Sequence, residues 1–272
     1  MSKSTEARVR DELLQTLYTH VLRCTLAAAA AGVRAEDAAT SAGVIANLQD
    51  DDIVLLPARR GVGLRTLCGL APVPARHKAH EHASRVYSLP RNEPQAVAFC
   101  LAMGLAAGVG QVVVVVLPPG VPLAVSHAKP RELPSTWTAA AAYAARAALP
   151  LLFLSVERSP AGPSSAAGAP ADPSRPAPLY PSIPVDRDDA LAVYRVAFEC
   201  LSRARTGGGP SYIAAGRYPA LPGPLLDSLS GDGLARLETM LRKRGRYSKA
   251  WQRSLEREIT RELTGVELTG QR

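Results

Sequence analysis

Cysteine is scarce in this sequence, and its spacing excludes a cysteine-based metal centre. The four cysteines are far apart in a chain of 272 residues, and each lies in an apolar or helical context: Cys24, Cys68, Cys100 and Cys200. Structural metal sites draw their cysteines from positions a few residues apart, and no pair here has that spacing. We therefore expect buried free thiols, as is typical of a protein in a reducing cytoplasm.

Long apolar runs are also missing. The run Val112–Leu117 is only six residues long, whereas a membrane-spanning helix needs about 20. The opening segment, MSKSTEARVRDELL, is charged from its start and contains no signal-peptide core. These absences predict a globular cytoplasmic protein that neither spans nor crosses a membrane.

Acidic residues are outnumbered, with 24 Asp and Glu against 32 Lys and Arg, for a net charge of +8. Much of the excess lies in Arg59–Lys78 and in the C-terminal stretch LRKRGRYSKAWQR. A basic nucleic-acid-binding module is one interpretation of this balance. A solvated helical face is the favoured interpretation, because glutamates alternate with the C-terminal basic residues (Glu238, Glu256, Glu258 and Glu262).

The middle of the chain has the rhythm of a parallel α/β sheet. Short apolar runs that predict buried strands alternate with helical patterns rich in small residues. The predicted strands are Ile53–Leu56, Val112–Leu117, Pro150–Val156 and Ser211–Ala215; the predicted helices are Glu93–Gly108, Thr136–Leu149 and Asp188–Arg205. The sequence therefore predicts an α/β fold, a mostly parallel sheet with helices on both faces, over residues 45–220.

Helices are predicted at both ends of this single domain. In residues 1–45, an apolar stripe recurs every four residues at Val9, Leu13, Leu17 and Val21. In residues 230–265, two further helices carry the stripes Leu234, Leu237, Leu241 and Trp251, Leu255, Ile259, Leu263. Asp232 and Ser248 are predicted N-caps and Gly245 a C-cap.

Residues 158–178 differ in composition from the rest of the chain, since they are almost entirely Ser, Pro, Ala and Gly. Such a segment buries too little apolar surface to offset the entropy of ordering it. We interpret it as a mobile loop between two strands.

Several segments, taken in order along nearly the whole chain, resemble one family. DDDIVLLPARRG is similar to its strand and Tyr-Arg loop, EPQAVAFCLAMGLAAG to its small-residue helix, and LPLLFLSVER to a strand that ends in paired asparagines. IPVDRDDALAVYRVAFECLSRARTGGGPSYIAAGRYP follows its VDGND…AVY…GP pattern, and GDGLARLETMLRKRGRYSKAWQRSLEREI its closing helix pair. The family is the alpha subunit of the thiamine-diphosphate-dependent dehydrogenase component of 2-oxoacid dehydrogenase complexes, of the pyruvate and branched-chain types. The resemblance implies the thiamine-diphosphate-binding fold.

The resemblance also implies thiamine diphosphate and magnesium as cofactors, but the motif that would hold them is eroded. The family binds the diphosphate through magnesium, with a Gly-Asp-Gly at the end of one strand and an asparagine after the next. Here the first motif is Pro118, Pro119 and Gly120, and the asparagines fall at Glu157 and Arg158. Magnesium needs oxygen ligands, and proline has neither a side-chain oxygen nor an N–H. We expect no cofactor binding, with Glu157 a remote candidate for a lone metal ligand.

Only two cofactor-binding positions remain by resemblance. Arg59 matches the arginine that contacts phosphate, although the preceding tyrosine is Ala58, and Gly120 is the surviving glycine. For Arg59, a solvated loop residue is as good an interpretation as a phosphate contact. For Gly120, a tight turn is a better interpretation than a ligand loop. For the histidines we favour polar surface positions over a metal site or a general base: His77, His80, His82 and His127.

Two functions stay open for this chain, along with the weaker nucleic-acid interpretation. Family resemblance favours a catalytic alpha subunit that decarboxylates a 2-oxo acid and passes the acyl group to a lipoyl carrier, completed by a beta subunit. The eroded motif favours a non-catalytic relative that keeps the fold and a partner surface. In either case we expect a homo-oligomer or a heteromer with a beta-subunit-like chain, because the alanine-rich helix faces would otherwise leave a large apolar patch exposed.

Overall fold

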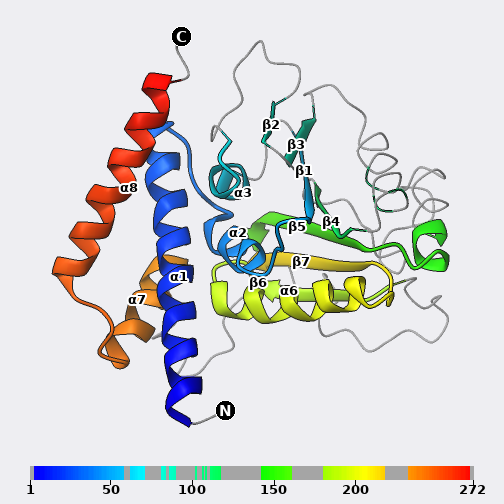
Figure 1. Ribbon diagram of the computed structural model, residues 1–272, viewed down its shortest axis with the longest axis horizontal. Coiled ribbons are helices and arrows are strands. Elements are labelled where there is room, and N and C mark those ends of the chain that lie inside the picture. The colour runs from blue at the N-terminus through cyan, green and yellow to red at the C-terminus, as the bar shows by residue number, and fades with distance from the viewer. Residues whose placement is uncertain are drawn as a thin grey trace.

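In the computed structural model the described residues are 3–57, 62–70, 81–83, 86–89, 102, 106, 108, 111–117, 142–160, 180–217 and 232–269. Their helices are α1 (Lys3–Ala30), α2 (Ala38–Ile45), α3 (Val62–Leu67), α6 (Ala190–Arg205), α7 (Gly233–Lys243) and α8 (Lys249–Thr269). Their strands are β1 (Ile53–Pro57), β2 (Glu81–Ala83), β3 (Val86–Leu89), β4 (Val113–Leu117), β5 (Leu151–Pro160), β6 (Ser182–Asp186) and β7 (Ser211–Arg217). Figure 1 shows one sheet with α1, α7 and α8 to one side of it.

The strands form one sheet in the order β2-β3-β1-β4-β5-β7-β6. β2 pairs with β3 in the antiparallel direction, and every other pairing is parallel. The central strands are continuous apolar runs because they are buried on both faces, as in other parallel sheets. All four predicted strands are present, whereas β2, β3 and β6 were not predicted.

Helices cover both faces of the sheet, which confirms the predicted fold class. Alternate strand residues such as Val114, Leu154 and Ile213 form one core with the inner side of α6. The intervening residues, such as Val115 and Phe153, pack against buried helical alanines on the opposite face: Ala102, Ala106 and Ala144. Small side chains there let the helix backbones approach the sheet closely.

The strand β6 forms one edge of the sheet, and its sequence limits further strand pairing. The N–H of Tyr212 bonds to the carbonyl of Pro181 at 2.9 Å, and the N–H of Arg187 bonds to the carbonyl of Gly216 at 3.0 Å. The backbone groups of odd-numbered residues in β6 therefore face β7, and those of even-numbered residues face outward. Pro184 occupies the middle outward position and offers no N–H, a common way to blunt an edge strand.

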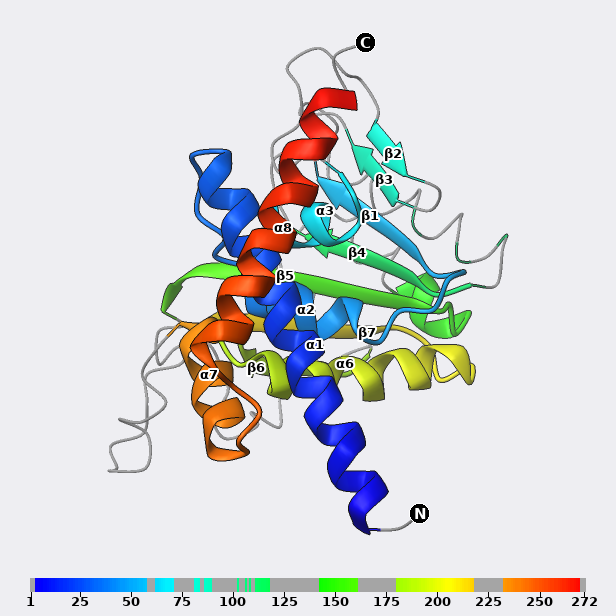
Figure 2. The same cartoon turned by 60° about the vertical axis from the view of Figure 1, so that its left-hand side comes forward.

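A third core joins α1 to α2, α7 and α8 (Figure 2). In α1 the fully buried positions include Leu14, Leu17 and Val21, whereas the predicted stripe residue Leu13 is only half-buried. A strict four-residue spacing drifts around a helix of 3.6 residues per turn, so the predicted stripe leaves the core at one end. The side chain of Val9 lies outside the described residues.

The predicted helix caps at the C-terminal end are confirmed. Asp232 accepts the N–H of Ala235 at 2.9 Å, and the hydroxyl of Ser248 accepts the N–H of Trp251 at 3.1 Å. Gly245 has φ +66° and follows Arg244, the C-cap of α7, at the position where a left-handed conformation favours glycine. The α7–α8 hairpin is thus set by local sequence signals.

The described cysteines Cys24, Cys68 and Cys200 are free, as expected. Burial raises the pKa of Cys68 and Cys200 to about 11 and raises the pKa of Cys24 as well, so these thiols stay protonated near neutral pH. Cys100 lies outside the described residues. Among the helices that are described, none combines the length and the apolar character needed to cross a membrane.

Candidate functional site at the carboxyl edge of the sheet

The strand order reverses at β1, because the strands that follow β1 in the sequence lie first on one side of it and then on the other. β1 lies between β3 and β4, so the chain goes from β1 to one side and then returns to the other. In open α/β sheets, loops that diverge in this way leave a crevice at the carboxyl ends of the strands, where ligands usually bind. The crevice here is expected between the carboxyl ends of β1 and β4.

This arrangement brings together the chain segments that carry the two predicted binding residues. β1 and β4 are parallel neighbours, with Leu55 opposite Val115. Arg59 follows the end of β1 by two residues, and Gly120 follows the end of β4 by three. Arg59, Gly120 and the prolines between β4 and Gly120 lie outside the described residues, so the structure places their strands and not their side chains.

Glu157 belongs to β5, the strand beside β4. β5 continues to Pro160, three residues into the segment predicted as a loop. β5 extends this far because it keeps pairing with β7, whose last residue Arg217 lies opposite Pro160. The register of this pairing shifts between Val156 and Pro160. The side chain of Glu157 and residues 161–179 lie outside the described residues.

Ser155 is a polar residue at this edge that the sequence analysis missed. It lies in β5 opposite Leu117, the last residue of β4. Its side chain is fully buried, and its hydroxyl has no hydrogen-bond partner in the described part of the chain. A serine within the apolar run LLFLSV was the available signal.

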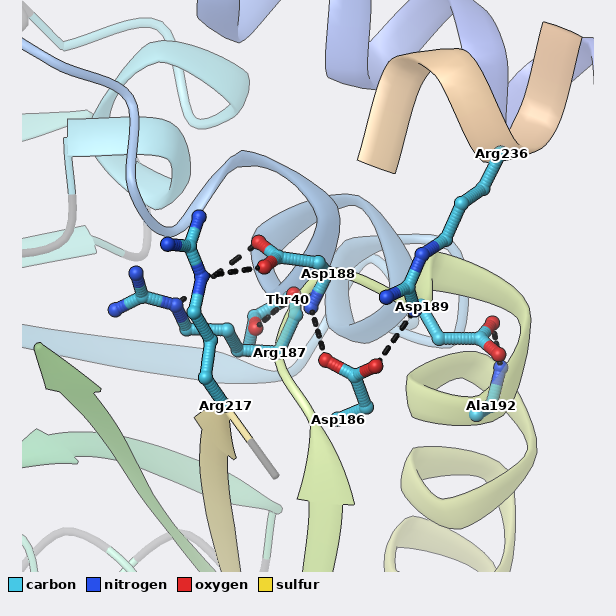
Figure 3. A network of polar contacts seen from close by, with 8 residues as sticks. All are labelled: Thr40, Asp186, Arg187, Asp188, Asp189, Ala192, Arg217 and Arg236. Atoms are coloured by element: carbon cyan, nitrogen blue, oxygen red, sulfur yellow. Dashed lines mark hydrogen bonds and ion pairs between the residues drawn. The ribbon is translucent and has the colours of Figure 1, made fainter. Parts of the chain in front are cut away.

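The polar loop between β6 and α6 is the best-defined cluster of charges at the carboxyl edge (Figure 3). Asp186 accepts the N–H of Asp188 at 3.0 Å and the guanidinium of Arg236, from α7, at 2.6 Å. Asp188 accepts Nε of Arg217, at the end of β7, at 2.8 Å. This hydrogen bond raises the pKa of Arg217.

The same loop is also tied to α2 and α6. Thr40 of α2 donates its hydroxyl to the carbonyl of Arg187 at 3.0 Å, and the Arg187 side chain is only 3% exposed. Asp189 caps α6 by accepting the N–H of Ala192 at 2.9 Å. We interpret the loop as a structural junction, because Asp186 and Asp188 are bonded to guanidinium groups and Asp189 to a helix terminus.

The described residues at this edge offer few oxygen ligands for a magnesium-bound diphosphate. Magnesium takes several oxygen ligands in octahedral geometry. At the ends of β4 and β5 the described chain offers the hydroxyl of Ser155, whereas Asp186 lies three strands from β4, about 14 Å at the usual strand spacing. No group of three or more metal-ligating side chains occurs among the described residues.

The start of α3, just after the loop that carries Arg59, is fixed by a buried carboxylate. The N–H of Gly63 donates to both oxygens of Asp37, at 3.1 and 3.0 Å, and the hydroxyl of Ser41 lies 3.3 Å from one of them. Burial raises the pKa of Asp37, and these hydrogen bonds partly oppose the rise. Asp37 precedes α2 but makes no side-chain cap bond there, so sequence alone would assign it to the wrong helix.

The side chains of the histidines considered as ligands or bases are not described. His82 is part of β2, but its side chain is not described, and His77, His80 and His127 lie outside the described residues. Asp232, by contrast, is confirmed as a helix cap.

Comparison with known proteins gives distant structural likenesses only. No family model matches the chain, and no curated protein matches it. A solved structure of an enzyme from Mycobacterium smegmatis, provisionally described as thiamin diphosphate-dependent, is similar to 68% of this chain with a TM-score of 0.37 and 15% sequence identity. The match covers 32% of that structure, so the chain corresponds to about a third of its length.

Proposed function

We propose that this protein is a non-catalytic relative of the alpha subunit of thiamine-diphosphate-dependent 2-oxoacid dehydrogenases. Its sequence blocks follow that family in order, and three of them overlap strands of the parallel part of the sheet, namely β1, β5, and β6 with β7. The chain would keep the α/β core and act by binding a partner subunit. The family's decarboxylation chemistry would be absent.

The observation that carries this proposal is the position of Pro118 and Pro119. They directly follow β4, whose neighbour β1 leads into the Arg59 loop at the crossover point of the sheet. A diphosphate in such a crevice carries concentrated negative charge, which a metal or several N–H donors must neutralise. Two consecutive prolines provide neither oxygen ligands nor N–H groups.

Subunit association is the activity that we propose in place of catalysis. The alanine-rich helix over residues 142–146 leaves Tyr143 49% exposed, and aromatic residues are enriched in protein interfaces. The proposed partner is either a second copy of the chain or a beta-subunit-like chain. Light scattering at micromolar concentration, with the chain alone and with a co-encoded beta-like chain, should detect an oligomer, and a monomer under both conditions would remove this part of the proposal.

Calorimetric titration with thiamine diphosphate tests the loss of the cofactor site. We expect no binding heat, with or without magnesium, at cofactor concentrations that saturate active members of the family. The variant Pro119→Asp with Arg158→Asn restores the aspartate and asparagine of the motif, so binding gained by this variant would support the assigned positions. Magnesium-dependent binding to the wild-type chain at micromolar concentration would instead support a catalytic alpha subunit completed by a beta subunit.

A further inference from the structure

The outer face of α8 carries a row of exposed cations. Lys249, Arg253, Arg257 and Arg261 recur every four residues, and all four are exposed. At 1.5 Å and 100° per residue, the row is about 18 Å long, has neighbours about 6 Å apart along the axis, and turns by about 120° around the helix. We refer to these four residues as the basic stripe.

Of the four glutamates that alternate with basic residues in the C-terminal sequence, three are bonded elsewhere, whereas Glu258 is exposed on α8 and forms no described ion pair with the stripe. Glu262 pairs with Arg23 of α1 at 2.6 Å, and Glu256 accepts the side-chain amide of Gln252 at 2.8 Å. Glu238 belongs to α7 and pairs with Arg242. The charge alternation seen in the sequence therefore leaves most of the basic stripe uncompensated, with Glu258 the exposed carboxylate near its Arg261 end.

The stripe residues have no acidic partner within the described part of the chain. Nε of Arg257 donates to the carbonyl of Arg253 at 3.2 Å, which leaves its positive charge uncompensated. The basic residues just before α8 differ, because Arg244 and Arg246 both bind Asp11 of α1, at 3.0 and 2.9 Å. Those arginines attach the hairpin to α1, whereas the stripe faces solvent.

The orientation of α8 explains why the stripe faces outward. The apolar side of α8 packs on α1 through residues such as Ile259, which is fully buried. Figures 1 and 2 both show α8 alongside α1 at the periphery of the molecule. The opposite side of α8 thus projects into solvent along its length.

The chemistry of this face favours a phosphate backbone as its partner. Apart from Glu258 at its edge, its other exposed residues are small or hydroxylic, namely Ala250, Ser254, Thr260 and Thr264. Protein interfaces rely on buried aromatic or aliphatic anchors, and interfacial membrane helices need an apolar face, which α8 already uses against α1. Arginines with neighbouring hydroxyls are typical of contacts to nucleic-acid phosphates.

We infer that the basic stripe of α8 binds the phosphate backbone of a nucleic-acid duplex without reading its sequence. Arginine can itself contact guanine in the major groove, but reading a mixed base sequence also requires side chains such as Asn or Gln for adenine. The exposed face has none, because Gln252 bonds to Glu256 and Tyr247 on the inner side. Stacking on single-stranded bases is not expected either, since Trp251 packs against Tyr18.

Fluorescence anisotropy with a short labelled DNA duplex tests this inference on the full chain. Four phosphate contacts predict a slope of log K against log salt of about −3 to −4, and so a loss of affinity of about a hundredfold between about 50 and 200 mM salt. Affinity should not depend on the base sequence of the duplex. Absence of binding at the lowest salt concentration would overturn the inference.

Two triple variants of equal charge separate the stripe from the net charge of the protein. Arg253→Gln, Arg257→Gln and Arg261→Gln should weaken binding at least tenfold and reduce the salt slope to about −1. The matched control replaces exposed arginines elsewhere (Arg146→Gln, Arg195→Gln and Arg203→Gln) and should leave the slope unchanged. Circular dichroism should show both variants folded, because glutamine is nearly as good a helix former as arginine.

The remaining outcomes would each contradict the inference. Equal losses in the two triple variants would assign binding to overall charge. Polyglutamate or phosphatidylserine vesicles that bind as tightly as the duplex, with the same dependence on the stripe arginines, would assign the surface to an acidic protein or to a membrane.

Discussion

Replacing Ile259 with alanine should specifically weaken the attachment of α8 to α1. Ile259 is fully buried and is the central residue of the apolar side of α8, between Leu255 and Leu263. The other contacts of α8 with α1 include one ion pair, Arg23–Glu262, in which both side chains are partly exposed. Exposed ion pairs contribute little to stability, so the apolar contact should dominate.

The expected magnitude follows from the size of the deletion. Ile259→Ala removes three carbon atoms beyond Cβ, worth about 0.8 kcal/mol each when buried, or about 2.4 kcal/mol in total. The cavity left behind adds to this cost, although α8 lies at the periphery and can shift towards α1, so we expect a loss of about 3 kcal/mol. The neighbouring variant Thr260→Ala changes an exposed residue and should alter stability by less than about 0.5 kcal/mol.

Urea unfolding followed by far-ultraviolet circular dichroism measures both variants under the same conditions. A lower midpoint with an unchanged slope would report a stability loss in one cooperative transition. An early partial loss of helical signal would show that α8 detaches before the sheet unfolds, and it should be larger in Ile259→Ala. If Ile259→Ala cost less than about 1 kcal/mol, or no more than Thr260→Ala, the proposed anchoring of α8 would be wrong.

Two further predictions concern α2 and its neighbours. Gly43→Ala would place a Cβ 2.8 Å from the carbonyl oxygen of Ala190, so it should lower the free energy of unfolding by about 1–3 kcal/mol in a thermal denaturation experiment. In the control variant Gly108→Ala, the new Cβ meets nothing within 4 Å, so the stability should stay the same or increase. Similar effects of the two variants would contradict this packing. Because burial raises the folded-state pKa of Asp37 above its ordinary value of 3.8, its carboxyl favours folding less as the pH rises from that value through the folded pKa. The unfolding free energy of the wild type relative to Asp37→Asn should therefore increase on acidification through this window, and a difference independent of pH would refute the prediction.

The sequence predicts those parts of the fold whose residues carry their own local signal. The central strands β4 and β5 are continuous apolar runs because both faces of a parallel sheet are buried. The caps at Asp232, Gly245 and Ser248 follow from residue types that suit helix ends. These features depend on neighbours in the chain, so a single sequence is enough to find them.

The elements and contacts that were missed depend on residues far apart in the sequence. β6 is an edge strand whose segment SIPVD has no apolar run, and only its pairing with β7 identifies it. The ion pair Asp186–Arg236 joins residues 50 positions apart, and Asp11–Arg244 joins residues 233 apart. Acidic and basic residues are too numerous for such pairs to be chosen from composition.

The candidate site shows the same division. The resemblance locates Arg59 and Gly120 in loops after two strands, but their proximity depends on β1 and β4 being neighbours. The order of strands is a property of the whole sheet, and it adds to the motif the fact that the strands before both loops are neighbours. It also separates Asp186 from the expected crevice, so this carboxylate does not replace the aspartate that the motif lacks.

The stability and the proposed nucleic-acid binding of α8 arise from opposite sides of one helix, so substitutions should separate them. Ile259→Ala acts on the inner side and should lower stability, while duplex affinity measured well below the unfolding transition should change little as long as α8 stays helical. The triple Arg→Gln variant of the basic stripe acts on the outer side, removes no described ion pair, and should lower affinity with stability nearly unchanged. If the triple variant lost stability and affinity together, the stripe would be stabilising the fold, and the loss of binding would no longer argue for a phosphate-binding surface.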